Sequence, residues 1–276
     1  MSVRRLLEQW DLRPSKGLGQ NFIADQAVVE KIVAAAELDS DDIVLEIGAG
    51  LGTMTTLLAR DAGRVAAVEL DQRLIPVLQS ELAGLDNVTL TQGDILALDP
   101  AALVGGLDLP YKVVANLPYY ITSAVLRHLL ECASKPRRMV LTVQREVAER
   151  IVAKPGRMSL LAVSVQFYGH PKLLFRIRPG SFYPVPRVQS AVVRVDVPTT
   201  PPVLVEDEGV FFRIVKAGFS QRRKQLRNAL SAGLRQQPAE VAARLKQVDV
   251  DPRRRAETLN LDEWARISRV LGGMEG

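Results

Sequence analysis

Short apolar runs recur along the first two thirds of the chain, separated by stretches with helical periodicity. Five of these runs have the length of buried strands, at 43–47, 65–69, 88–92, 112–116 and 139–144. Strands that alternate with helices are typical of a parallel sheet covered on both faces. Two further β-rich runs, at 173–177 and 190–197, are predicted to form a hairpin that closes the same sheet.

A Thr-Thr-Pro-Pro segment at 199–202 ends this pattern, and the rest of the chain has helical periodicity. One helix is predicted to begin at Gln237-Pro238, and the segment Ala256–Leu271 is predicted to form a final amphipathic helix preceded by a loop. The pattern therefore predicts two domains, an α/β domain over 1–198 and a smaller all-helical domain over 203–276.

Glycines follow the first predicted strand at alternate positions. Gly48, Gly50 and Gly52 lie just before a helical run at 54–60, so the backbone makes a tight bend without side chains at a helix N-terminus. Such a bend suits the close approach of a nucleoside-bearing ligand. A nicotinamide dehydrogenase would space its glycines as G-x-G-x-x-G, whereas here an acid, Glu46, stands two positions before the first glycine. The spacing therefore favours another nucleoside ligand.

The next two predicted strands also end in acidic residues. Glu69 ends the second strand and is followed by Asp71, at the place where a doubly wound fold sets an acid against ribose hydroxyls. Gly93-Asp94 follows the third strand and offers a carboxylate to an adenine amine. Three successive strand ends thus supply groups that suit an adenosine-containing cofactor.

The fourth predicted strand runs into Asn116-Leu117-Pro118-Tyr119. The amide oxygen of Asn116 and the carbonyl of the Leu117-Pro118 peptide can each accept a hydrogen from an exocyclic amine, such as N6 of adenine. Pro118 stiffens the loop, and Tyr119 offers an aromatic face for a base taken out of its stack. Two such acceptors would localise the lone pair of the amine toward an arriving methyl group, so methyl transfer to this amine would need no strong base. The alternative is a strand that ends in an ordinary proline turn with a half-buried tyrosine.

These motifs, in this order, resemble the KsgA-like family, the adenine N6,N6-dimethyltransferases that modify small-subunit ribosomal RNA. The resemblance covers nearly the whole chain. It extends to Gly-Gln-Asn-Phe at 19–22, to Phe-Tyr-Pro-Val-Pro at 182–186 with Val188 and Ser190, and to the basic segment 219–228.

The resemblance implies a Rossmann-like, S-adenosylmethionine-dependent methyltransferase sheet of seven strands with helices on both faces. It also implies that Glu69 binds the ribose of the donor, that Asp94 holds its adenine, and that Asn116 serves both donor and target. Tyr119 and Phe182 would sandwich the target adenine, although Phe182 could equally anchor the core beside a proline-rich loop. The remaining donor contacts that it implies are Asn21, Gly48, Gly50 and Ile23, the last at a position where leucine is expected.

By the same resemblance, the reaction is dimethylation of two adjacent adenosines in a loop near the 3′ end of 16S rRNA, late in small-subunit biogenesis. A large-subunit RNA dimethyltransferase would share the core, but the segment 219–228 favours the small-subunit group. A DNA adenine methyltransferase would share the Asn-x-Pro-Tyr chemistry, yet no base-reading module is evident. The chain could also act chiefly as a ribosome-assembly factor.

Positive charge is concentrated in the second predicted domain. The net charge is +5, and Arg213–Ala239 holds seven basic residues and no acidic ones. A polyanion is the expected partner, and a solvated basic face is the alternative. A flexible N-terminal arm with Arg4, Arg5, Arg13 and Lys16 is expected to extend the same surface. The residues predicted to bind RNA are Arg222, Arg223, Lys224 and Arg227.

Composition narrows the remaining possibilities. The chain has 276 residues, 47% of them hydrophobic, which suffices for a buried core. Its single cysteine, Cys132, cannot form an internal disulfide, and no apolar run is long enough to span a bilayer or to serve as a signal peptide. We therefore expect a cytoplasmic monomer without membrane contact. His128 and His170 lack partners at ligand spacing, so no metal is expected.

Overall fold

The computed structural model describes residues 2–107 and 109–273. The chain forms two compact units. The first contains the described residues up to Ala148 together with Pro171–Val197, and the second contains Glu149–His170 together with the described residues from Pro198 onward.

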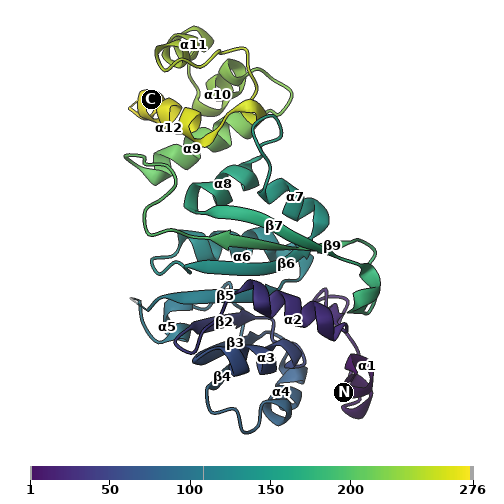
Figure 1. Ribbon diagram of the computed structural model, residues 1–276. Coiled ribbons are helices and arrows are strands. Elements are labelled where there is room, and N and C mark those ends of the chain that lie inside the picture. The colour runs from purple at the N-terminus through teal and green to yellow at the C-terminus, as the bar shows by residue number, and fades with distance from the viewer. Residues whose placement is uncertain (1, 108, 274–276) are drawn as a thin grey trace. The chain divides into compact units, whose positions relative to one another are not determined.

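The first unit is built on a sheet of seven strands, as the sequence predicted (Figure 1). The strand order is β4-β3-β2-β5-β6-β9-β7. The first five strands in this order pair in parallel, and β9 pairs antiparallel to β6. The bounds are β2 Ile43–Ile47, β3 Arg64–Glu69, β4 Val88–Gln92, β5 Tyr111–Asn116, β6 Arg138–Gln144, β7 His170–Ile177 and β9 Ser190–Asp196.

Both faces of this sheet are covered, because both alternating sets of strand side chains are buried. Val44 and Val114 belong to the core that contains side chains of α2 and α3, whereas Leu45 and Val113 point to the opposite face and have no exposed surface. Figure 1 shows α2 and α3 in front of the sheet. After the N-terminal helix, the α-helices of this unit are α2 Gln26–Ala35, α3 Thr53–Asp61, α4 Ile75–Glu81, α5 Pro100–Val104, α6 Thr122–Glu131 and α7 Arg145–Ile151, whose last three residues lie in the second unit.

The start of the chain is a helix rather than the flexible arm expected from the sequence. Helix α1, Val3–Gln9, buries Val3, Leu6 and Leu7 in a cluster with Leu51 and Leu74. The spacing of these three apolar residues puts them on one helix face, so burial holds the segment in place. Arg4 pairs with Glu8 of the same helix at 2.9 Å.

A two-stranded sheet lies beside the main one. It pairs β1, Phe22–Ile23, with β8, Phe182–Tyr183, in antiparallel register, so that Ile23 faces Phe182. This pairing brings the segment after α1 next to the loop that leads into β9.

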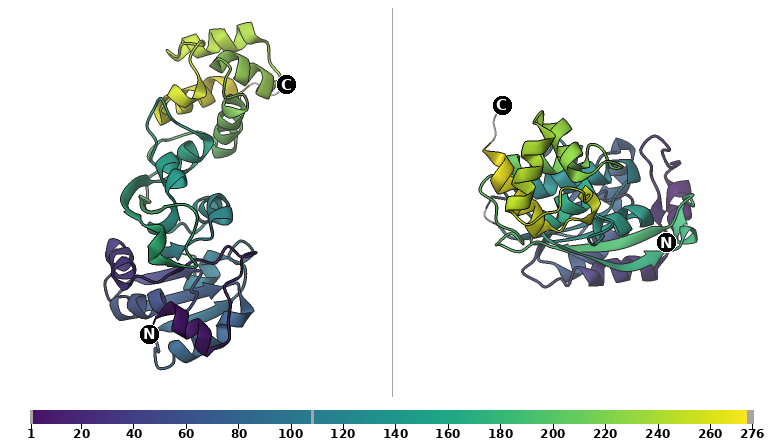
Figure 2. Two further views of the ribbon diagram at one scale, coloured as in Figure 1. Left: turned by 90° about the vertical axis from the view of Figure 1, so that its right-hand side faces the viewer. Right: turned by 90° about the horizontal axis from the view of Figure 1, so that it is seen from above.

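The second unit is a group of helices, and Figure 2 shows α9 to α12 gathered together in green to yellow. Residues 149–170 belong to this unit, whereas the predicted division had assigned them to 1–198. The cause is aromatic packing, since the rings of Phe167 and Phe211 lie 4.7 Å apart between centroids. The helices are α8 Leu160–Tyr168, α9 Glu208–Phe219, α10 Leu226–Leu234, α11 Pro238–Gln247 and α12 Leu261–Gly272.

The predicted helix start at Pro238 is confirmed, but the last helix begins later than Ala256. Asn260 and Glu263 form a capping box that fixes the start of α12, and Ala256–Thr258 forms only a 3-10 turn. None of the helices in the described part of the chain is long and apolar enough to cross a membrane.

Candidate functional site at the carboxyl ends of the strands

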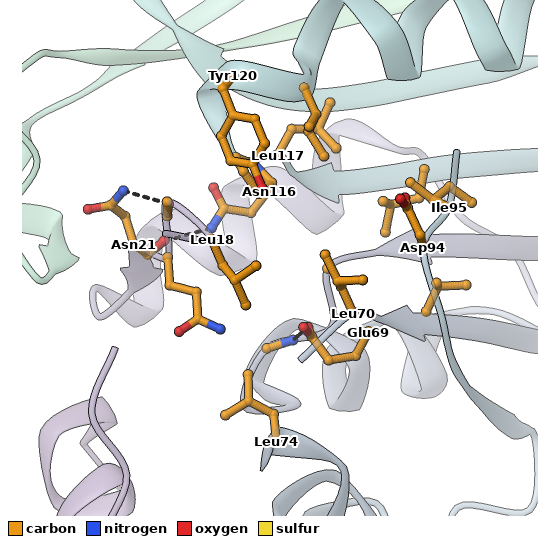
Figure 3. A pocket seen from close by; sticks show the side chains of 18 of the residues that line it. Leu18, Asn21, Glu69, Leu70, Leu74, Asp94, Ile95, Asn116, Leu117 and Tyr120 are labelled. Atoms are coloured by element: carbon orange, nitrogen blue, oxygen red, sulfur yellow. Dashed lines mark hydrogen bonds between the residues drawn. The ribbon is translucent and has the colours of Figure 1, made fainter. Parts of the chain in front are cut away.

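A cavity of about 330 Å³ opens where the parallel strands end (Figure 3). Its walls come from the carboxyl ends of β2, β3, β4 and β5 and from the segment before β1. This is the edge at which open α/β sheets bind ligands. The cavity brings together nine of the residues predicted from the sequence, which are Asn21, Gly48, Gly50, Glu69, Asp94, Asn116, Leu117, Pro118 and Tyr119.

The glycine turn forms one wall of the cavity. The backbone φ angles of Gly48 and Gly50 are +79° and +62°, a conformation that side chains disfavour. A Cβ atom on Gly50 would also lie 3.3 Å from the ring of Phe22. The backbone N–H of Gly48 donates to the carbonyl of Val68 at 2.9 Å, which ties the turn to the end of β3.

Glu69, at the end of β3, is 6% exposed and fixed by backbone donors. The N–H of Gly50 donates to Oε2 of Glu69 at 2.8 Å, and the N–H of Asp71 donates to Oε1 at 2.8 Å. Burial raises the pKa of Glu69, and these two hydrogen bonds partly oppose that rise. The carboxyl group is therefore held in place by the fold before any ligand arrives.

Gln20 and Asp71 form a contact at this wall that sequence reasoning missed. Gln20 lines the cavity and donates from Nε2 to Oδ2 of Asp71 at 2.8 Å. Arg73 also donates to Asp71 and is the main reason that the pKa of this carboxyl is lowered. The only signal for this contact was the Gly-Gln-Asn-Phe motif itself.

Asp94 stands at the opposite end of the cavity, after β4. Its Oδ1 accepts the N–H of Leu96 at 3.0 Å, so the carboxyl closes a local turn. Its other oxygen has no hydrogen-bond partner among the described residues and is available to a ligand amine. The apolar lining of the cavity includes Leu70 and Leu74 near Glu69, and Ile95 and Leu96 after Asp94.

Asn116 ends β5 and has its side-chain amide anchored. Nδ2 donates to the backbone carbonyl of Asn21 at 2.9 Å, and the side chain of Asn21 donates to the carbonyl of Gly19 at 3.0 Å. Within the part of the chain that the structure describes, Oδ1 of Asn116 has no donor. The amide is thus oriented with its acceptor unused.

The residues after Asn116 form a stiff loop. Leu117 is buried and donates its N–H to the carbonyl of Thr142 at 3.3 Å, and Pro118 adopts φ −54° and ψ 132°. Tyr119 is half-buried, and its hydroxyl lies 2.8 Å from Oγ of Ser190. Burial raises the pKa of Tyr119, so this hydroxyl stays protonated at neutral pH. The ring of Tyr119 is therefore held at its backbone end by this loop and at its hydroxyl end by Ser190.

Ile23 and Phe182 do not line this cavity, contrary to the sequence-based expectation. Both belong to the hydrophobic core, and Phe182 is only 2% exposed, because the pairing of β1 with β8 turns the two side chains inward. Phe182 thus lies where its alternative role as a core anchor would place it, and its stacking role stays a prediction. Ile23 lines a smaller cavity of about 40 Å³ together with Glu46.

In the second unit, the predicted RNA-binding residues are exposed. Arg222, Arg223 and Lys224 lie in the turn between α9 and α10, and Arg227 lies on the first turn of α10. None of the four side chains forms an ion pair or a hydrogen bond among the described residues. Four cations are therefore presented to solvent without internal neutralisation.

Known proteins of similar sequence cover nearly the whole chain. A protein named Ribosomal RNA small subunit methyltransferase A from Dehalococcoides mccartyi strain CBDB1 is 47% identical over 271 residues, which are 98% of this chain and 93% of the relative. A protein of the same name from Moorella thermoacetica is 46% identical over 275 residues, covering 96% of this chain and 95% of the relative.

Two solved structures share the fold. The 23S rRNA methyltransferase ErmE matches with a TM-score of 0.73 and 28% identity, covering 91% of this chain and 99% of that one. A dimethyladenosine transferase from Plasmodium falciparum matches with a TM-score of 0.77 and 23% identity, covering 91% and 97%. The profile of the family described as "Ribosomal RNA adenine dimethylase" matches residues 13–272. By this match and by the identity to its relatives, the chain belongs to the ribosomal RNA adenine dimethylase family.

Proposed function

We propose that this protein transfers methyl groups from S-adenosylmethionine to N6 of adenosines in small-subunit ribosomal RNA, and forms N6,N6-dimethyladenosine. The observation that carries the proposal is Asn116, whose amide is anchored to the carbonyl of Asn21 while its oxygen remains free in the cavity. The relatives of 46–47% identity named for the small subunit support this substrate over large-subunit RNA.

The residues of the cavity fit an adenosine-containing donor. When bound, S-adenosylmethionine supplies an electrophilic methyl group on a sulfonium. Glu69 offers carboxylate lone pairs to ribose hydroxyls beside the glycine turn, and Asp94 offers its unused oxygen to an adenine amine. Leu70 and Ile95 supply apolar surface for the ring.

The target amine is activated by acceptors rather than by a base. Oδ1 of Asn116 and the carbonyl of Leu117 would each accept one N6 hydrogen, which localises the nitrogen lone pair toward the donor. Tyr119 would hold the flipped base against its ring, with the hydroxyl fixed by Ser190. Positioning and oriented dipoles would supply most of the rate.

In the second methylation, N6 of the target can donate fewer hydrogen bonds to Asn116 and Leu117 than in the first. Each transfer would break the sulfonium C–S bond, release S-adenosylhomocysteine and leave a cationic methylated N6 that gives up one proton to water. After the first transfer N6 would therefore keep one hydrogen, so only one of the two acceptors would remain engaged. The other acceptor then faces the new methyl group.

The basic residues of the second unit would bind the phosphates of folded RNA. Arg222, Arg223, Lys224 and Arg227 are exposed and lack internal partners among the described residues, which suits contacts with a polyanion. We propose that they hold the subunit while two adjacent adenosines near the 3′ end of its RNA are modified, at a late stage of assembly.

The test is methyl transfer from labelled donor to undermethylated small subunits, large subunits and DNA in parallel, followed by nucleoside analysis. The proposal expects N6,N6-dimethyladenosine from small subunits alone. Label in large subunits or DNA would contradict the substrate assignment. Tight binding to small subunits without transfer, seen equally for wild type and Asn116→Ala, would instead support an assembly factor.

A further inference from the structure

Two adjacent tyrosines of the cavity wall have different surroundings. Tyr119 is half-buried and its hydroxyl contacts Ser190. Tyr120 also lines the cavity, but it is 63% exposed, and its hydroxyl forms no hydrogen bond with any described residue. An aromatic ring that stays this exposed contributes little to the stability of the fold. Exposed apolar surface beside a binding cavity often marks an interaction site.

The ring of Tyr120 lies against the backbone of Gly19. Gly19 adopts φ +61°, and a Cβ atom there would lie 3.3 Å from Cε1 of Tyr120 and 3.7 Å from Cβ of Pro118. A side chain at position 19 would therefore press against the ring, and glycine leaves room for it. The ring is backed by main chain while most of its surface remains open.

The backbone at Gly19 is connected to Asn116. The carbonyl of Gly19 accepts the side-chain amide of Asn21, and the carbonyl of Asn21 accepts the amide of Asn116. Two hydrogen bonds thus join the backbone under Tyr120 to the side chain proposed to polarise the target amine. Figure 3 shows Tyr120 beside Asn116 and Leu117, away from Asp94 and Ile95 at the other end of the cavity.

We infer that Tyr120 is a second stacking surface, which holds an unpaired RNA base next to the adenosine in the cavity. The inference rests on the proposed function. A nucleotide flipped into the cavity leaves its neighbour without a stacking partner, and an open aromatic face replaces that partner for any base. The donor is the less suitable occupant, because Glu69 and Asp94 lie at other strand ends.

The experiment uses a short RNA stem-loop that carries 2-aminopurine next to the target adenosine, since the fluorescence of this base falls when it stacks. The full-length wild type should quench the probe, and Tyr120→Phe should quench it equally, because the hydroxyl has no partner. Tyr120→Ala should lose the quench and bind the RNA about tenfold more weakly, within the range for one stacked base. Donor affinity, measured by calorimetry, should stay unchanged.

Leu107→Ala is the matched control, because Leu107 is 62% exposed and does not line the cavity. It should quench and bind like the wild type. Tyr120→Leu keeps an apolar side chain against Gly19 but removes the flat ring, so it must lose the quench even if the alanine variant is unstable.

Retained quench and RNA affinity in Tyr120→Leu would overturn the inference, as would a loss of donor affinity as large as the loss of RNA affinity. Failure of the proposed function gives a different result, in which the wild type quenches the probe but transfers no methyl group. A wild type that methylates while the Tyr120 variants behave normally would refute only the stacking surface.

Discussion

The side-chain amide of Asn116 donates to the backbone carbonyl of Asn21 at 2.9 Å, across 95 positions of sequence. This hydrogen bond joins the end of β5 to the segment that precedes β1. It also determines which atom of the amide can bind a substrate, because Nδ2 already donates to Asn21 whereas Oδ1 accepts no hydrogen bond from a described residue. The proposed polarisation of the target amine depends on this orientation.

Asn116→Ala should remove most turnover and lower donor affinity only partly. Loss of one oriented dipole at a reacting centre typically costs about 10²- to 10³-fold in rate. Single-turnover methyl transfer and equilibrium donor binding separate the two effects. A variant that keeps its rate within about threefold of wild type would contradict the polarisation role.

Asn116→Asp is the more specific companion variant. It keeps the shape of the side chain but replaces the donating nitrogen with an acceptor that faces the carbonyl of Asn21. We expect it to lower the rate as much as Asn116→Ala and to loosen the segment before β1. Faster hydrogen exchange at Gly19–Ile23 in Asn116→Asp than in wild type would show that loosening.

Glu69→Gln should weaken donor binding with little effect on the chemical step. Both carboxylate oxygens of Glu69 accept backbone N–H groups, so an amide nitrogen would confront one donor with another. A charged-group hydrogen bond contributes about 1.5–3 kcal/mol, so the Kd of the donor should rise about tenfold or more. Isothermal titration calorimetry measures the Kd of the donor. Glu81→Gln, an exposed position on α4 outside the cavity, should leave the Kd unchanged.

Local sequence patterns predicted the strands well because buried strands leave a strong apolar signal. Six of the seven strands begin within one residue of the prediction, and β7 begins at His170 rather than at 173. Segments where long-range packing decides the structure were less predictable. Helix α1 is too short for a clear periodic signal, and its three buried side chains pack in a cluster with residues distant in sequence, among them Leu51, Leu74 and Val77.

The cavity was predictable in part for a topological reason. Glu69, Asp94 and Asn116 were assigned to strand ends, and parallel strands bring their carboxyl ends to one edge. The contact of Gln20 with Asp71 joins positions 51 residues apart, and the Gly-Gln-Asn-Phe motif around Gln20 does not indicate its partner. The inward turn of Phe182 also depends on a partner strand, β1, that is only two residues long.

Replacing Arg222 and Arg223 together by glutamate should weaken RNA binding and flatten its dependence on salt. Each lost phosphate contact reduces the slope of log affinity against log salt by about 0.7 to 0.9. The slope of the double variant should therefore fall by about 1.4 to 1.8, while donor affinity stays at the wild-type value. Filter binding across a salt series gives the slope.

The control for this pair is Lys31→Glu combined with Arg60→Glu. Both side chains are exposed on α2 and α3 of the first unit, and the change in net charge is the same. If the control flattens the slope equally, the effect is one of overall charge, and α10 with its preceding turn returns to the interpretation of a solvated basic face.

Glu46 lies on β2 with no exposed surface, and both carboxyl oxygens lack a hydrogen-bond partner among the described residues. Burial is the main reason that its pKa is raised to about 8. The hydroxyl of Thr55 lies near enough to oppose this rise, although outside hydrogen-bond geometry, and the charge of Glu69 adds to it. At neutral pH the folded protein therefore keeps a proton here that the unfolded chain releases.

The free energy of unfolding should consequently fall as pH rises from about 4.5 to about 8, by up to about 1.4 kcal/mol per pH unit from this group. Below pH 4.5 Glu46 is protonated in both the folded and the unfolded protein, so its ionisation does not reduce the free energy of unfolding there. Glu46→Gln cannot titrate, so its stability relative to wild type should increase from pH 5 to pH 8. Urea unfolding at unit pH steps measures this, with Glu81→Gln as the exposed control. Parallel pH profiles for wild type and Glu46→Gln would mean that Glu46 is already ionised in the folded protein.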